Sequence, residues 1–279
     1  MDVINLRKRI RTAITSGYEA LRGIIHGGSL VPLASLHQEA HQTSLLIQCL
    51  QISKCHVHGQ DVFSDANLQI QRGNFTFLVG PGGTGKSTLF RLLLGLESLD
   101  QGHILIEGRN LQHLRRREIP YFRRRIGVVF QDFKLVKQRT VFENVALPLE
   151  VAGKEHLFIR KKVHRILRML RLDHRMNTPC SRLSAGERQM VAIARAVVTD
   201  PVILLVDEPT GNLDEDALRS AMDVFAAVHE RGATVIVATH DVSLPSLIPG
   251  SRVVAIHQGK FMEKVFQERM ASPTGTRLL

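Results

Sequence analysis

Nine residues, GPGGTGKST at positions 80–88, constrain the fold of this chain more than any other segment. They contain four glycines and one lysine, and they lie between the apolar segments FTFLV and TLFRLLLGL. Because glycine has no Cβ, consecutive backbone N–H groups can turn toward a bound anion, and a helix that starts after the loop adds the positive end of its dipole. The segment therefore predicts a strand, a phosphate-binding loop and a helix, in that order.

The spacing Gly80-x4-Gly85-Lys86-Ser87 is that of a P-loop, which binds a nucleoside triphosphate. Lys86 supplies a positive charge for the β- and γ-phosphates, and Ser87 supplies a hydroxyl for Mg²⁺. An ordinary glycine turn would not need the strand and the helix on its two sides. The residues expected to hold the nucleotide here are Gly80, Pro81, Gly82, Gly83, Thr84, Gly85, Lys86, Ser87 and Thr88.

A pair of acidic residues narrows the class of enzyme. Asp207 and Glu208 follow the apolar run PVILLV (201–206), and ligands of open α/β sheets bind at the carboxyl ends of such strands. We expect Asp207 to reach the Mg²⁺ shell and Glu208 to accept a proton from an attacking water molecule. This pair favours hydrolysis over transfer to a substrate hydroxyl. The sequence has no NKxD-type guanine motif, so ATP is the expected nucleotide.

The rest of the chain indicates an α/β protein. Buried-type runs at 201–206 and 235–240 alternate with helical patterns, which predicts a parallel sheet. Residues 140–175 have helical spacing, with Ile159, Val163, Ile166 and Leu170 on one face and a basic surface on the other. No segment approaches the roughly 20 apolar residues of a membrane-spanning helix. The net charge of +11 admits a nucleic acid, an anionic lipid or a polyphosphate as partner.

A third motif, LSAGERQ (183–189), identifies a family. Ser184 and Glu187 form the pattern of a helix capping box, and the motif lies 23 residues before Asp207. Together with the two nucleotide motifs, it resembles the ATP-binding cassette (ABC) family. Three further segments are similar to that family: Gln131 in VVFQDF, the stretch GNLD (211–214) and His240 in VIVATHD.

The resemblance implies a P-loop NTPase fold with a RecA-like core, an antiparallel β subdomain and a helical subdomain. The expected domains are an N-terminal extension (1–45), a nucleotide-binding domain (46–262) with its helical subdomain at about 138–194, and a C-terminal tail (263–279). The extension is either loosely held or an amphipathic helix at a membrane surface.

The resemblance also assigns roles to residues. Glu208, His240 and Gln131 would be catalytic, and Gln131 would join Ser87 and Asp207 around Mg²⁺. Two copies would form a homodimer that encloses ATP head to tail. The remaining nucleotide contacts would come from His56, which would stack on adenine, and from Ser184, Gly186 and Asp214. Three positions depart from the family pattern: Ala185 replaces a usual Gly, Met190 a usual Arg, and His56 a usual Tyr.

Within the family, the segments at 117–133, 139–153 and 207–214 most resemble bacterial cell-division ATPases of the FtsE type. That resemblance implies an ATPase peripheral to the cytoplasmic face of the inner membrane, held there by an FtsX-like integral membrane protein. The partner would dock beside Gln131, where Phe130, Phe133, Leu135 and Val136 offer apolar surface. No nucleic-acid partner is expected.

Three alternatives remain open. One is the ATPase subunit of an importer or of a lipoprotein- or macrolide-export transporter. Another is a soluble ABC protein of DNA repair or translation, which usually has coiled-coil insertions or tandem cassettes. The third is a binding module without hydrolysis, against which the presence of both Glu208 and His240 argues.

Overall fold

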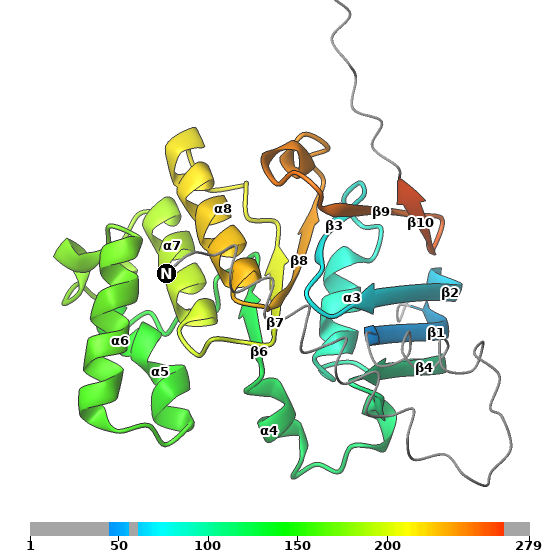
Figure 1. The fold of residues 1–279 in the computed structure, drawn as a ribbon, viewed down its shortest axis with the longest axis horizontal. Helices are drawn as coiled ribbons and strands as arrows, with labels where there is room; N and C mark the ends of the chain where they lie inside the picture. Colours follow the sequence, from blue (N-terminus) through cyan, green and yellow to red (C-terminus); the bar gives the residue numbers. More distant parts are fainter. Residues whose placement is uncertain (1–44, 56–60, 265–279) are drawn as a thin grey trace, which may run out of the picture. The chain divides into compact units, whose positions relative to one another are not determined.

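The computed structural model describes residues 45–55 and 61–264 of the chain. In these residues the strands form a six-stranded sheet of order β10-β9-β3-β8-β7-β6 and a four-stranded sheet of order β2-β1-β4-β5 (Figure 1). The strands of the larger sheet are β3 (Phe75–Val79), β6 (Ile126–Val129), β7 (Ile203–Asp207), β8 (Thr234–Thr239), β9 (Arg252–His257) and β10 (Lys260–Lys264). Those of the smaller sheet are β1 (Leu45–Cys55), β2 (Asp61–Gln71), β4 (Gln101–Ile106) and β5 (Arg109–Asn110).

The larger sheet is parallel except at the edge where β10 pairs with β9. β3, β7 and β8 are buried along their whole length, which explains their continuous apolar sequences. Successive side chains of β3 enter opposite layers: Phe75 and Phe77 join one hydrophobic core cluster, and Leu78 joins the other. The predicted parallel α/β sheet is therefore confirmed.

Helices cover both faces of this sheet. On one face α3 (Lys86–Leu93) and the antiparallel sheet cover it, and on the other face lie α7 (Ala185–Val197) and α8 (Glu215–Glu230) (Figure 1). α5 (Val141–Val151) packs against α7, and α6 (His156–Met169) packs against α5. The short α4 (Ile119–Arg123) precedes β6. Short 3-10 turns span Leu111–His113, Asp173–Arg175, Cys180–Arg182 and Leu244–Leu247.

The helical pattern at 140–175 divides into α5 and α6. Gly153, with a φ of 70°, lies in the turn between them. The predicted apolar face of α6 is buried, and its basic side chains Arg160, Lys161, Arg165 and Arg168 are exposed. Thr140 and Glu143 form a capping box that starts α5.

Close packing of α7 on β6 depends on a glycine. A Cβ atom at Gly127 would lie 2.2 Å from the carbonyl oxygen of Ala196. The missing side chain therefore lets the end of α7 approach the sheet. This contact matters for the site because α7 begins at the LSAGERQ motif.

The N-terminal extension, His56 and the tail beyond Lys264 lie outside the described residues. The proposed division into domains thus stays a prediction. No helix in residues 45–55 and 61–264 combines the length and the apolar content that a membrane span requires.

Candidate nucleotide site

A cavity of about 680 Å³ lies at the carboxyl ends of the parallel strands. The loops after β3, β6, β7 and β8 all reach this edge, which is where open α/β sheets bind ligands. Residues from five separate motifs meet there. The cavity is lined by Gly82, Gly83, Gly85, Lys86, Ser87, Thr88, Arg91, Gln131, Glu208, Gly211, Asn212 and His240.

Lys86 is the centre of this arrangement. Its side chain is 5% exposed, and its Nζ donates to the carbonyl oxygens of Gly80 at 2.6 Å and Pro81 at 3.0 Å. Nζ also lies 3.2 Å from Oε1 of Glu208. A buried ammonium needs such partners because burial removes its hydration. The loop itself is kept open by Gly83 and Gly85, which have φ values of 80° and 100°.

Glu208 contacts two of the other motifs at once. Its Oε2 accepts a hydrogen bond from Nδ1 of His240 at 2.7 Å and lies 3.3 Å from the His240 backbone nitrogen. Its own backbone nitrogen donates to Ala238 on β8. Glu208 has a φ of 48°, a left-handed conformation that is uncommon for a residue with a side chain and is frequent at functional sites. The carboxylate is thus fixed between Lys86 and His240.

Asp207 is the last residue of β7 and lies beside Ser87, which lines the cavity. It is 6% exposed, and its Oδ1 is buried without a hydrogen-bond partner in the described part of the chain. Burial raises the pKa of Asp207, and the Ser87 hydroxyl and Lys86 act in the opposite direction. A carboxylate oxygen without a partner beside a serine hydroxyl is an oxygen-donor set of the kind that Mg²⁺ prefers.

Some expected residues lie elsewhere. Gly80, Pro81 and Thr84 form the back of the loop, where Thr84 Oγ1 donates to the Pro81 carbonyl at 3.0 Å. Ser184, Gly186 and Asp214 do not line the cavity within one chain. Arg91, which the sequence reasoning missed, does line it. The signal was available, because Arg91 lies four residues after Ser87 and therefore on the same face of α3.

The LSAGERQ motif starts α7 as its capping box predicts. The hydroxyl of Ser184 accepts from the Glu187 backbone at 3.1 Å, and the Glu187 carboxylate accepts from the Ser184 backbone at 2.8 Å. Arg175 holds the same carboxylate at 2.9 Å. Ser184 is exposed, so the N-terminus of α7 can reach another molecule. Met190, which departs from the family pattern, is buried in the core cluster, and Ala185 is half-buried in the first turn.

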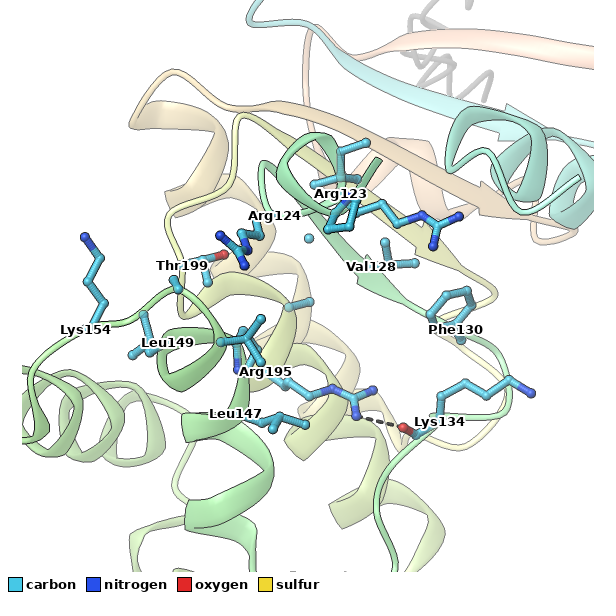
Figure 2. A pocket seen from close by; sticks show the side chains of 17 residues that line it. Arg123, Arg124, Val128, Phe130, Lys134, Leu147, Leu149, Lys154, Arg195 and Thr199 are labelled. Atoms are coloured by element: carbon cyan, nitrogen blue, oxygen red, sulfur yellow. Dashed lines mark hydrogen bonds between the residues drawn. The ribbon is translucent and has the colours of Figure 1, made fainter. Parts of the chain in front are cut away.

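The loop after Gln131 borders a second pocket, shown in Figure 2. This groove of about 640 Å³ is lined by Pro120, Arg123, Arg124, Ile126, Gly127, Val128, Phe130, Lys134, Leu147, Pro148, Leu149, Val151, Ala152, Lys154, Arg195, Ala196 and Thr199. Phe130 belongs to it as expected for an apolar docking surface. Phe133 and Leu135 instead pack against the core cluster, and Val136 is exposed but does not line the groove. The exposed apolar side chain of the groove is Val151 of α5.

The fold and the cavity define a P-loop nucleoside triphosphatase. Comparisons with known proteins narrow this class. A sequence model of the ABC transporter family matches residues 63–211. The cell division ATP-binding protein FtsE of Bacillus subtilis is 40% identical over 214 residues, which cover 77% of this chain and 93% of the relative. FtsE of Escherichia coli is 42% identical over 202 residues, which cover 72% and 90%.

A comparison with solved structures also indicates an ATP-binding cassette. A dimeric ATP-binding cassette in a post-hydrolysis state, bound to ADP and Pi, matches with a TM-score of 0.74 and 31% identity. The match covers 80% of this chain and 99% of that one. The chain therefore belongs to the ABC transporter family of ATP-binding proteins, and it is an ATPase.

Glu187→Gln tests the electrostatics at the start of α7. Glutamine can keep the capping box but has no charge for Arg175. The Ser184 backbone N–H and Arg175 hold the pKa of Glu187 below its ordinary value of 4.5. The charge therefore stabilises the fold above about pH 4.5 and ceases to do so as the pH falls through the lowered pKa.

The variant should lose about 0.3–1 kcal/mol of unfolding free energy at pH 7, a usual value for a charge at a helix end. The loss should shrink toward zero as the pH falls through the lowered pKa, as measured by urea unfolding at pH 7 and at several pH values below 4.5. Glu150→Gln, on the exposed face of α5, serves as the control. If the loss of unfolding free energy were the same at pH 7 and at the lowest pH, this account of Glu187 would be contradicted.

Proposed function

We propose that this chain is the ATP-binding and hydrolysing subunit of an FtsEX-like membrane complex that acts in bacterial cell division. It would lie peripherally at the cytoplasmic face of the inner membrane, held by an FtsX-like integral membrane protein. The observation that carries this proposal is the set of relatives described as cell division ATP-binding proteins. They are 36–43% identical to this chain over 86–93% of their own length.

The proposed nucleotide contacts use two copies of the chain. The P-loop of one copy holds the phosphates, and Ser184, Gly186 and Asp214 of the other copy complete the site. The exposed N-terminus of α7 supports this arrangement, since free N–H groups at a helix start bind anions. Gly186 lies beside the loop at Asn212, where an added Cβ would be 3.0 Å from the backbone oxygen. His56 remains the proposed adenine contact.

The proposed chemistry begins with the pairing of Lys86 and Glu208. Lys86 Nζ lies 3.2 Å from the Glu208 carboxylate and compensates its charge. A bound γ-phosphate competes for Lys86 and leaves Glu208 free to accept a proton from water. His240, whose side chain is 64% exposed and lines the cavity, holds that carboxylate through Nδ1. Gln131 would orient the water molecule from the opposite loop.

Ser87, Asp207 and Gln131 are the proposed Mg²⁺ ligands. The buried Oδ1 of Asp207 supports this assignment, because it has no hydrogen-bond partner within residues 45–55 and 61–264, and a buried carboxylate oxygen without a partner is costly. When bound, Mg²⁺ supplies positive charge to the phosphate oxygens. Phosphate oxygens and water would complete its shell, since Mg²⁺ rarely takes all of its ligands from the protein.

The groove in Figure 2 is the proposed docking site for a cytoplasmic helix of the partner. Its lining is mostly apolar, with Leu147 and Leu149 from α5 on one side and Phe130 on the other. Pro148 and Val151 of α5 also line it. Val151 is 55% exposed and lies within this mostly apolar lining, and contiguous apolar surface of this kind often marks an interaction site. The loop that borders the groove begins at Gln131, so the groove lies next to the nucleotide cavity.

Glu208→Gln tests the catalytic assignment. The amide cannot accept a proton, so steady-state ATP turnover should fall by about 10²–10⁴-fold, the usual contribution of a general base. ATP binding should persist, and light scattering after gel filtration should give a dimer with Mg·ATP. Glu230→Gln at the end of α8 is the control and should keep parental turnover. Parental turnover in Glu208→Gln would contradict the role of Glu208.

Val151→Glu tests the docking groove. The charge would be buried without a partner when a helix occupies the groove, so the protein should leave the membrane fraction of cells that also express the FtsX-like protein. ATP binding should be retained. Val242→Glu, at an equally exposed valine outside the groove, should remain at the membrane. Release on deletion of residues 1–45, with no release for Val151→Glu, would show that the anchor is the N-terminal segment and not the groove.

A further inference from the structure

One face of α6 is exposed and strongly basic. It carries four exposed cations, Arg160, Lys161, Arg165 and Arg168. Within residues 45–55 and 61–264, no ion pair joins any of the four to an acidic side chain. Residues 154–171 contain seven arginines and lysines and one acidic residue, a surplus of six charges against +11 for the whole chain. This surface therefore attracts anions.

The same face also exposes apolar side chains. Leu157 is 68% exposed at the start of α6, and Met169 is 45% exposed at its end. Together with the four cations and His164, they line a hollow of about 780 Å³. We call these seven residues the α6 face. Its mixture of cations and exposed apolar groups is that of a helix which lies in a membrane interface.

The helical repeat separates this face from the buried one. Ile159, Val163, Ile166 and Leu167 are buried in the core cluster and hold the helix in place. Lys162 turns aside and pairs with Asp200, so it does not belong to the α6 face. The helix is thus fixed along one side, and the α6 face is preformed for binding along the other.

The start of α6 adjoins the groove of Figure 2. Lys154 lines that groove, and Leu157 follows it by three residues. α6 also packs against α5, which forms one wall of the groove (Figure 1). The proposed function puts a membrane protein in the groove, so the start of α6 would then lie toward the bilayer.

We propose that the α6 face binds the headgroups of anionic phospholipids, as a direct lipid contact in addition to the protein partner. Only its place beside that partner rests on the proposed function. The cations pair with headgroup phosphates, and each contributes about fivefold to binding at an anionic surface. Leu157 and Met169 enter the boundary between headgroups and acyl chains. Such a contact is weak and reversible on its own, so it orients a chain that the partner already retains.

A nucleic acid fits this surface less well than a bilayer does. Phosphate contacts would satisfy the cations but would leave Leu157 and Met169 exposed to water. Single strands also need aromatic rings on which bases stack. Phe158 is the exposed aromatic residue of α6, and the ammonium of Lys162 already lies over its ring, 5.6 Å from the centroid. A bilayer interface accepts both the cations and the apolar side chains.

The test variant combines Arg160→Gln, Lys161→Gln and Arg165→Gln, since glutamine supports a helix about as well as lysine or arginine. The control variant loses the same charge at exposed residues of β5, the end of α8 and β10, through Arg109→Gln, Arg231→Gln and Lys260→Gln. Both variants should keep the parental rate of ATP turnover, which shows that they fold.

Co-sedimentation of the full chain is measured with vesicles of phosphatidylcholine alone and with about 30% phosphatidylglycerol, at about 0.1 M salt. The parent should bind the anionic vesicles at least about tenfold more tightly than the neutral ones. The test variant should lose about tenfold or more of this affinity, and the control variant should stay within about twofold of the parent. Binding of the parent should weaken at about 1 M salt, where charges are screened beyond about 3 Å.

A second variant, Leu157→Gln, keeps every cation and tests the apolar part of the contact. Its affinity for the anionic vesicles should fall about threefold or more, because leucine gains free energy when it leaves water. Val242→Gln, at a valine that is 62% exposed and lies outside the α6 face, should bind like the parent.

Parental vesicle binding by the test variant overturns the proposal, as does an equal loss in the control variant. A parent that does not prefer anionic vesicles overturns it as well. If the test variant binds vesicles like the parent but loses binding of a labelled oligonucleotide, the α6 face is a nucleic-acid site instead. The vesicles contain no FtsX-like protein, so a failure of that partner to retain the chain would contradict the proposed function alone.

Discussion

The site depends on one buried ammonium group. Lys86 leaves water when the chain folds, and its charge must be compensated by the carbonyl oxygens of Gly80 and Pro81 and by Glu208. These partners come from the ends of β3 and β7, so the compensation requires that the parallel strands reach the same edge of the sheet in the correct register. Buried strands and close packing of helices on the sheet secure that register.

The same pairing fixes the Glu208 carboxylate in the cavity. Glu208 is held by Lys86 on one side and by His240 on the other. In the proposed mechanism a phosphate group would compete for the first of these contacts, so that nucleotide binding and the release of the carboxylate would be linked by charge. The site needs no protein nucleophile for hydrolysis, because positioning and charge stabilisation are sufficient for phosphoryl transfer.

Local patterns made much of the fold predictable. A continuous apolar run marked β7, the glycine spacing marked the loop before α3, and Ser184 with Glu187 marked the start of α7. These features depend on neighbours within a few residues. The pairing of Lys86 with Glu208 joins residues 122 positions apart and rested on the expected strand order and family resemblance. The attachment of Arg195 to Lys134, 61 positions away, had no local signal at all. Phe133 was expected on an apolar surface, but it packs partly buried against the core cluster, and its left-handed φ of 61° had no local signal in the sequence.

The central claim is that Lys86 makes this cavity a site for ATP phosphates. The most direct measurement is a calorimetric titration of the parent chain and Lys86→Ala with Mg·ATP. The account predicts a dissociation constant at least about tenfold weaker for the variant, since its loop keeps the backbone dipoles but loses the cation. Lys162→Ala, at a partly buried lysine paired with Asp200 away from the cavity, should bind like the parent. Equal affinity for Lys86→Ala and the parent would contradict the account.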